Sequence, residues 1–340
     1  MKGWIGVSLA GLILVCGAGR VEGQTKNMMS ATDLPKISVI GNFTATNHEA
    51  KIKEIETAFQ GYLDPNIRAD IFLSLEAPQS SGDGEFELNI EEAFLTFSGY
   101  WDGVGMKLGK KRVGFGKENV RHPEQWNMTD LPLAIQYYLG DEGLAYQSGS
   151  LDVLLPLPFF CQWEIGAGYN RQIKNIGVKR AILNSRLWAS WSWEDRSELE
   201  TGLSLLSGEW EKGSPGKEGQ LYGMDVTYKV WTGPYSKWIS QTEVLLSSRT
   251  VSGESVNRWG ISSFLGMTLD SHWETGLRLE CVQHPESELL VSRKATGQMT
   301  YRVSETTKSR FSLGYDDNLK EMQVGVQLLF GVGPHSHVLQ

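Results

Sequence analysis

Residues 67–75 read IRADIFLSL, and this stretch decides the fold. One set of alternate positions is wholly apolar: Ile67, Ala69, Ile71, Leu73 and Leu75. The positions between them are polar except for Phe72. A period of two that is sustained over nine residues is the pattern of a β-strand with one apolar and one polar face. The stretch therefore predicts a strand whose two faces meet different surroundings.

The same alternation recurs along the chain, and each recurrence predicts a further strand. It is clear at 183–193, 199–205, 222–230, 259–269, 273–281 and 322–330. Residues 49–62 also show a helical spacing of apolar residues. We nevertheless expect a strand at 54–63, because the turn Asp64-Pro65-Asn66 and a clear strand follow directly. Together with the less regular segments, the pattern predicts about sixteen strands, with about 14 or about 18 as the neighbouring sizes.

The segments between the strands alternate in length. Short ones, rich in turn-forming residues, fall at 63–66, 99–103, 156–160, 194–197, 232–236, 270–271 and 304–307. Longer polar ones lie between them, at 77–85, 112–142, 171–182, 207–219, 247–257 and 283–296. Short turns at one end and long loops at the other are typical of a transmembrane β-barrel. We therefore predict an all-β fold, an antiparallel up-and-down transmembrane barrel.

Large aromatic residues gather beside the short turns: Tyr62, Tyr100, Trp101, Phe159, Phe160, Trp193, Trp231, Tyr235, Trp238 and Trp273. Tyrosine and tryptophan prefer the membrane–water interface, where the ring is buried and the polar atom stays wet. A preference for strands alone would not collect them at one class of turn. The placement favours an aromatic girdle at one rim of a membrane barrel. The alternative is a soluble periplasmic sandwich, which needs neither a girdle nor an apolar outer face.

The first residues have the composition of a secretory leader. Lys2 supplies a positive start, residues 4–16 are mostly apolar, and Val21-Glu22-Gly23 offers tolerated residues at the cleavage positions. We predict a signal peptide at 1–23, a periplasmic segment at 24–35, the barrel at 36–330 and a periplasmic tail at 331–340. Cys16 raises a lipoprotein anchor as an alternative, against which Val15 argues. An exported barrel is expected in a bacterial outer membrane, in contact with lipid and lipopolysaccharide.

The chain is acidic, with a formal net charge of −8, yet the stretch GKKRVGFGKENVR that begins at Gly109 is basic. It enters the longest predicted loop, 112–142, which would be the third on the outer side. A sixteen-strand barrel encloses a water-filled lumen unless something fills it, so a loop folded inward would narrow it. A ring of basic side chains there would favour anions. The candidate constriction residues are Lys107, Lys111, Arg112, Lys117 and Arg121.

Lys107 and Lys111 lie on the non-apolar side of the strand that leads into the loop, so both are expected to face the lumen. The basic run also has a simpler interpretation. It could be a solvated outer surface or a contact with anionic lipopolysaccharide.

Four segments carry a family resemblance: GYLDPNIRADIFLSLE (61–76), IEEAFLTF (90–97), LGKKRVGFGKENVRHPEQWNMTDLPL (108–133) and GVQLLFGVGPHSH (325–337). The most specific part is His-Pro-x-x-Trp-x-x-x-Asp-x-Pro-Leu, which falls on His122, Pro123, Trp126, Asp130, Pro132 and Leu133. These segments resemble a family of Gram-negative outer-membrane β-barrel proteins, variously labelled porin-like, zinc-regulated or TonB-dependent receptors. The resemblance implies an outer-membrane barrel and no particular substrate. The label of TonB-dependent receptor fits this chain poorly, because such receptors combine a larger barrel with a plug domain and this chain is too short for both.

Signals for other chemistry are weak. Gly114-Phe115-Gly116-Lys117 hints at a phosphate loop, but the flanking residues do not complete the Walker pattern. Neither GxSxG nor HExxH is present, so we expect no enzyme and no cofactor. His335 and His337 lack a third ligand nearby, and we expect no bound metal. The acidic total argues against nucleic-acid binding, and Cys161 and Cys281 are too few for a disulfide framework.

The sequence thus predicts a channel for passive diffusion of small hydrophilic solutes or ions, with an anion bias, with 112–142 as the constriction, and with a homotrimer as one form of assembly. Two rivals stay open. A cargo-specific uptake barrel would bind metal or metal complexes through His122, Asp130 and the loop carboxylates. A plugged structural or adhesive barrel would need many large inward side chains, of which Phe72 and Trp188 are two.

Overall fold

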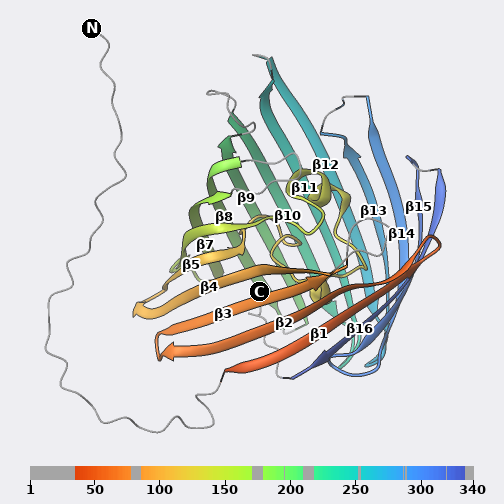
Figure 1. The fold of residues 1–340 in the computed structure, drawn as a ribbon, viewed down its shortest axis with the longest axis horizontal. Coiled ribbons are helices and arrows are strands. Elements are labelled where there is room, and N and C mark those ends of the chain that lie inside the picture. Colours follow the sequence, from red (N-terminus) through yellow and green to blue (C-terminus); the bar gives the residue numbers. More distant parts are fainter. Residues whose placement is uncertain are drawn as a thin grey trace, which may run out of the picture. The chain divides into compact units, whose positions relative to one another are not determined.

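Sixteen antiparallel strands close into one barrel in the part of the chain that the structure describes (Figure 1). This computed structural model describes residues 35–77, 86–170, 179–194, 196–209, 218–251, 254–285, 287, 289–318 and 320–333. The strands are β1 (Lys36–Thr46), β2 (Ala50–Asp64), β3 (Ile67–Glu76), β4 (Glu87–Trp101), β5 (Val104–Arg112), β6 (Ala145–Leu154), β7 (Phe160–Asn170), β8 (Lys179–Trp193), β9 (Ser197–Glu209), β10 (Glu218–Trp231), β11 (Lys237–Val251), β12 (Glu254–Thr268), β13 (Trp273–Gln283), β14 (Val291–Arg302), β15 (Lys308–Asp316) and β16 (Glu321–Val332).

Each strand pairs with the next along the chain, and β1 pairs with β16, where Phe43 lies opposite Leu328. Closure leaves no strand edge with unpaired backbone groups, which lipid could not hydrogen-bond. The predicted up-and-down barrel is therefore confirmed, at sixteen strands. The ambiguous segment 49–62 is a strand, as expected. Among the described residues, no helix combines the length and apolar composition needed to cross a membrane.

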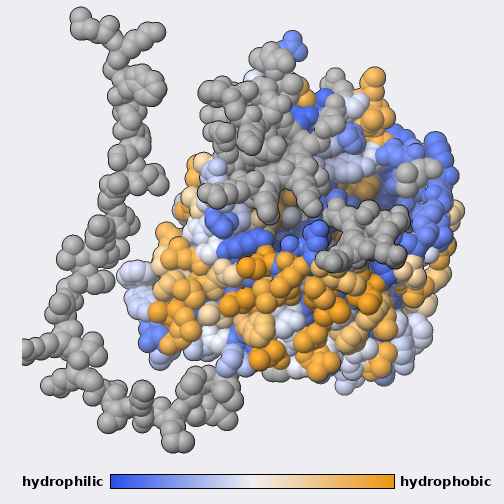
Figure 2. All heavy atoms as spheres, in the orientation of Figure 1, coloured by the Kyte–Doolittle hydropathy of each residue, from blue (hydrophilic) through white to orange (hydrophobic). Residues whose placement is uncertain are grey.

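The outer face of the barrel is apolar and the inner face is mostly polar. On β9, Leu203 and Leu205 are exposed on the outside, whereas the alternate residues Glu200 and Ser204 are buried inside. The same outward pattern of large apolar residues continues on the other strands, and Figure 2 shows such residues gathered over the front strands. An outward apolar surface of this extent is stable in contact with lipid and not with water. The barrel is thus built to span a membrane.

Aromatic residues lie exposed where the strands meet the short turns, as the sequence predicts. Tyr62 and Trp101 flank the turns at 65–66 and 102–103, and Trp193, Tyr235 and Trp273 lie at further turns on this rim. Exposed indole and phenol groups at one rim suit the lipid–water boundary. This rim therefore marks one edge of the membrane-embedded band.

One expectation about the connections is wrong. Residues 247–257 are not a long loop, because β11 and β12 run to Val251 and from Glu254 and stay paired, with Arg249 opposite Val256. The outward residues Ser248, Thr250 and Asn257 are polar here, while the inward residues Ser247 and Arg249 stay buried, so the strands continue without the apolar outer face. The predicted loop 112–142 lies between β5, which ends at Arg112, and β6, which begins at Ala145. It contains a 3₁₀ turn, Pro123–Gln125, and a helix, α1 (Leu133–Leu139), which is too short to show a clear helical period.

Two β-bulges interrupt the alternation near one another. The pairing of β1 with β2 shifts between Asn42 and Phe43, which leaves Lys53 as the extra residue. The pairing of β3 with β4 shifts between Phe72 and Leu73, which makes Glu91 the extra residue. A bulge lets two successive side chains point to the same face of a sheet. Glu91 and Glu92 can therefore both face the interior of the barrel.

Candidate functional site in the barrel lumen

The long connection between β5 and β6, residues 113–144, folds into the barrel, and we call it the lumen loop (Figure 1). Its two ends are adjacent, because the Val113 N–H donates a hydrogen bond to Leu144 O at 2.9 Å. The Asn119 side chain ties both ends together. Its Nδ2 donates to Val113 O at 2.9 Å, and its Oδ1 accepts from the Leu144 N–H at 2.7 Å. The loop thus leaves and re-enters the wall at one place.

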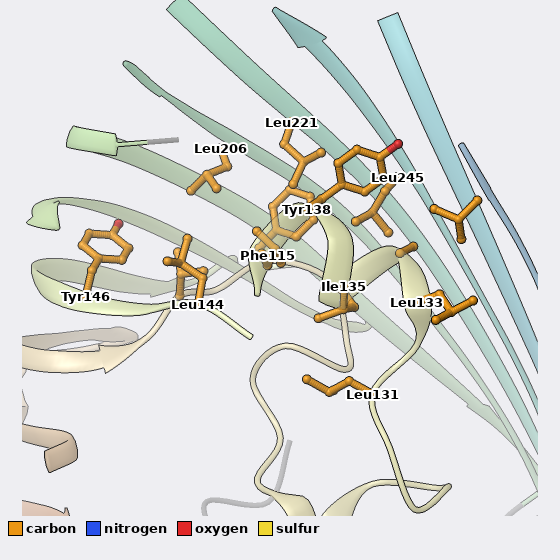
Figure 3. Close-up of a cluster of buried hydrophobic side chains, with 14 of the residues drawn as sticks. Phe115, Leu131, Leu133, Ile135, Tyr138, Leu144, Tyr146, Leu206, Leu221 and Leu245 are labelled. Carbon is orange, nitrogen blue, oxygen red and sulfur yellow. The ribbon is translucent and has the colours of Figure 1, made fainter. Parts of the chain in front are cut away.

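An apolar cluster fastens the loop to the wall. Phe115, Ile135 and Tyr138 of the loop are buried against side chains from the inner face of several strands (Figure 3). The wall residues of this cluster are Ile182, Leu206, Leu221, Leu245 and Val282. Burying one such side chain contributes about 1.5–3 kcal/mol. Leucines at inward positions, which would be out of place in an open aqueous lumen, are explained by the loop that covers them.

The wall also provides space for the loop. Gly223 on β10 faces the ring of Phe115, and a Cβ there would lie 2.9 Å from Phe115 Cζ. Gly116 has φ of +61° and donates its N–H to Ser204 Oγ at 3.0 Å. The next N–H, of Lys117, donates to Glu243 Oε1 at 3.2 Å. A Cβ at position 116 would lie only 1.6 Å from that carboxylate oxygen. Glycine is therefore required at 116 for both conformation and space.

Replacing Gly116 by alanine is expected to loosen the loop without unfolding the barrel. The left-handed conformation costs a residue with a Cβ about 1–2 kcal/mol, and the clash with Glu243 adds to this. Limited trypsin digestion of the refolded barrel should then cut at Lys117 or Arg121 faster than in the unchanged protein. Gly297→Ala is the matched control, because a Cβ there meets nothing nearer than 3.9 Å. Equal digestion of the two variants would contradict this role of Gly116.

Each of the five predicted constriction residues has a carboxylate partner. Lys107 Nζ lies 3.2 Å from Asp152, and Lys111 Nζ lies 2.6 Å from Glu164. The remaining pairs are Arg112 with Glu91 at 3.3 Å, Lys117 with Glu200, and Arg121 with Glu118 at 2.7 Å. Lys107 and Lys111 face inward, as their alternation predicts. The partners come from β4, β6, β7, β9 and the loop itself, so the five charges are spread around the wall.

The motif residues hold the loop to further strands of the wall. The His122 ring lies between Glu56 of β2, 3.0 Å from Nδ1, and Glu92 of β4, 2.8 Å from Nε2. Asp130 pairs with Arg278 at 2.5 Å and with Lys294 at 2.8 Å. The Trp126 Nε1–H donates to Arg121 O at 3.0 Å. These contacts join the loop to β2, β4, β13 and β14.

The prolines of the motif set the ends of the regular segments. Pro123 is the first residue of the 3₁₀ turn, and Pro132 directly precedes α1. The Leu133 N–H, at the start of α1, donates to Glu280 Oε1 of β13 at 2.7 Å. At the other end of α1, Tyr138 Oη donates to Gln283 O at 3.0 Å. The helix is thereby fixed along β12 and β13.

The contacts of the lumen loop shift the pKa values of its charged residues. Burial alone would raise the pKa of Asp130, but Arg278 and Lys294 hold it well below its usual range. Burial and the neighbouring Arg121 lower the pKa of Lys117 to about 8, although Glu200 opposes the shift. Burial would likewise lower the pKa of His122, yet its hydrogen bonds with Glu56 and Glu92 raise it well above the usual value. At neutral pH the loop is therefore held by charged pairs.

Several residues that hold the loop are not apparent from the loop sequence. Arg310 of β15 donates to Met128 O at 3.0 Å and also to Trp126 O. Gln298 of β14 donates to Asn127 O at 3.0 Å, and Lys308 donates to Glu124 O. These strand residues sit at inward positions of regular strands. The sequence signal for them is a large polar residue on the polar face of a predicted strand, which identifies the face but not the partner.

Comparison with known proteins places the fold among outer-membrane barrels. An anion-selective porin from Comamonas acidovorans superposes with a TM-score of 0.59 at 12% identity, over 88% of this chain and 99% of that one. OmpT of Vibrio cholerae gives 0.58 at 8% identity, over 91% and 100% of the two chains. The outer-membrane channel DcaP of Acinetobacter baumannii gives 0.57 at 10% identity, over 88% and 96%. These likenesses show a shared fold.

The sequence is also similar to that of a curated protein. An uncharacterized protein of Aquifex aeolicus (strain VF5) is 24% identical over 230 residues, which are 58% of this chain and 48% of that protein. The chain thus matches about half the length of this relative. No family model matches the sequence. The porin-like family resemblance of the motif segments therefore stays a prediction.

Proposed function

We propose that the protein is an outer-membrane channel for small hydrophilic solutes, with the lumen loop as its constriction. The observation that carries this proposal is a closed barrel with an apolar outside and a polar inside, crossed by a loop that is fixed to the inner wall. The loop contacts strands on opposite sides: His122 lies against β2 and β4, Lys117 against β9, and Asp130 against β13 and β14. Any path through the barrel therefore runs between the loop and the wall, which limits solute size.

A second candidate is a barrel that is closed at rest. Inward residues on strands far apart around the barrel are buried, among them Asn42 on β1, Thr227 on β10 and Gln327 on β16. In the plugged barrel that the sequence leaves open, large wall side chains would fill the lumen. Here the filling comes from the loop instead, so a movement of the loop could open a path that it otherwise closes.

Planar-bilayer conductance of the refolded barrel distinguishes the two candidates. Stable discrete open steps at low voltage support the channel with a fixed constriction. A correctly folded barrel that inserts and shows no steps supports the closed form. Folding is checked independently by the mobility shift between unheated and heated samples in detergent gels, so a silent barrel cannot be confused with a misfolded one.

The anion bias that the sequence predicts remains part of this proposal. The ion pairs of the basic residues limit how strong this anion preference can be. Because each of the five basic residues has a carboxylate neighbour, they contribute less selectivity than five uncompensated charges would. Fixed charges select ions through the field they leave unbalanced at the pore. We therefore expect a modest bias, and the reversal potential in a salt gradient measures it.

Replacing Lys107, Lys111, Arg112 and Lys117 together by glutamine is expected to shift the reversal potential toward cation preference. The change leaves Asp152, Glu164, Glu91 and Glu200 without these counter-charges. The control replaces three basic residues that are more exposed to solvent, Lys51, Arg293 and Lys320, and should shift the potential less. An unchanged potential in the fourfold variant would place these pairs away from the permeation path.

We further propose that the protein is exported to the outer membrane and assembles there. The predicted signal peptide at 1–23 lies outside the described residues, and it would deliver the chain to the outer membrane. One OmpT structure of Vibrio cholerae is described as a trimer form, and we include a homotrimer here. Crosslinking of the protein in native membranes tests the assembly, since a single band at monomer size would contradict it.

A further inference from the structure

A group of acidic side chains lies where the lumen loop meets β2 and β4. Three carboxylates, of Glu56, Glu91 and Glu92, lie around the imidazole of His122, with that of Glu54 next to them, and we call this group the His122 cluster. Glu56 and Glu92 flank the ring at hydrogen-bond distance, and Glu91 Oε2 lies 3.9 Å from Nδ1. Glu54 lies beside Glu91. The side chains of Glu56 and His122 are 3% and 5% exposed, so the cluster is shielded from water.

The backbone is shaped to bring these groups together. Glu54 and Glu56 are alternate residues on the inner face of β2. On β4, regular alternation would turn Glu91 outward toward lipid, but the bulge at this residue keeps Glu91 and Glu92 both inside. Bulges of this kind are enriched next to functional sites, where they redirect a side chain. The second bulge, at Lys53, lies beside Glu54.

The charges of the cluster do not balance. Arg112 pairs with Glu91 at 3.3 Å, and its backbone N–H also donates to Glu92. With a protonated His122, three cationic groups (Arg112, Lys53 and His122) face four carboxylates. Among the described residues, no donor lies within hydrogen-bond distance of Glu56 Oε1, although this oxygen is buried. A buried carboxylate oxygen without a donor is costly, and a bound cation would satisfy it.

From this geometry we propose that Glu56, Glu91 and His122 Nδ1 bind a divalent first-row transition-metal cation. The three ligand atoms lie within 4.8 Å of one another. The distances from Nδ1 to Glu56 and Glu91, 3.0 and 3.9 Å, bracket the separation of about 3.3 Å expected between ligands of a tetrahedral zinc ion. One imidazole with carboxylates suits zinc, iron or manganese better than magnesium. The cation would replace the Nδ1 proton and leave the proton on Nε2.

The remaining contact of His122 fits a metal ligand. Its Nε2 lies 2.8 Å from Glu92 Oε2. Metal-binding histidines usually donate their second ring N–H to a carboxylate or carbonyl, which fixes the tautomer. Glu92 thus has a positioning role. Because two ligands come from the wall and one from the loop, a bound cation would fasten the loop to β2 and β4.

Zinc binding to the refolded barrel tests the proposal. His335 and His337 are replaced by alanine throughout, so that the tail cannot bind metal, and Zn²⁺ is titrated against a chromophoric chelator. We expect one Zn²⁺ per chain, at least 100-fold weaker binding in Glu56→Gln, and about 10–100-fold weaker binding in Glu92→Gln. Glu91→Gln should also lose at least 100-fold, and it keeps both hydrogen bonds of His122, so the loop stays seated. Millimolar Mg²⁺ should not compete.

The matched control is Asp225→Asn, which changes a buried carboxylate on β10 that pairs with Arg186 of β8 and is not part of the cluster. It should bind Zn²⁺ like the unchanged barrel. Absence of stoichiometric binding by a barrel with the correct gel mobility shift would overturn the proposal. So would binding that survives both Glu56→Gln and Glu91→Gln, since that places the metal elsewhere. Equal competition by Mg²⁺ would overturn the ligand role of His122. None of these outcomes depends on conductance.

Discussion

Deleting residues 114–143 and joining Val113 to Leu144 through a short turn is expected to raise the single-channel conductance several-fold. The join is feasible because these two residues are already hydrogen-bonded. Without the loop, a barrel of sixteen strands has the size class that encloses an open aqueous channel. Ion flow through the remaining lumen would then be limited by the wall alone. Single-channel recording at fixed salt and voltage measures the change.

The control for this deletion replaces residues 114–143 by a glycine- and serine-rich segment of equal length. Such a segment keeps the chain length but has none of the apolar or charged contacts with the wall. It should give an intermediate and noisy conductance, because it moves in and out of the lumen. If the deletion leaves the conductance unchanged, the loop does not limit permeation, and the proposed constriction is wrong.

Replacing Asp130 by alanine is expected to release the part of the loop that lies against β13 and β14. The change leaves Arg278 and Lys294 without their shared carboxylate. Removing one partner of a buried ion pair typically costs 3–5 kcal/mol. Asp130 is 31% exposed, so we expect about 3 kcal/mol, at the lower end. The barrel wall should stay folded while the loop becomes accessible to protease and the conductance fluctuates.

Asp141→Ala is the matched control, because Asp141 is an exposed aspartate of the same loop. It should digest and conduct like the unchanged protein. A third variant, Asp130→Asn, keeps the shape and the hydrogen-bond acceptor to Arg278 and should lie between the two. If all three variants show the same protease resistance, the pairing of Asp130 does not hold the loop in the lumen.

The fold could be predicted from the sequence because a strand pattern is local. The alternation at 67–75 reappears as β3, and the aromatic residues beside the short turns lie at one rim as expected. The prediction fails where the physical surroundings of a strand change. At 247–257 the outward positions become polar as well as the inward ones, and the period of two disappears although the pairing continues.

The site was harder to predict because its contacts are distant in sequence. The loop sequence shows that Lys111 and Lys117 are basic, but their partners Glu164 and Glu200 lie 53 and 83 residues further along the chain. Nothing in the loop distinguishes a paired lysine from a free one. Glu91 was hidden for a different reason, since a bulge breaks the alternation that assigns faces. The adjacent glutamates in IEEAF were a signal, but strand alternation places only one of them inside.

The contacts between the lumen loop and the wall affect the order in which the parts of the chain can fold. Its contacts reach strands that are made much later, since Leu133 and Glu280 are 147 positions apart and Glu124 and Lys308 are 184 positions apart. Contacts so distant in sequence form slowly, because the chain must first lose the entropy of closing large loops. Until β8–β13 have assembled, Phe115 and Ile135 have no wall to cover them. The last strands therefore close the barrel around a loop that was synthesised early, and the order of synthesis opposes the order in which that loop can become buried.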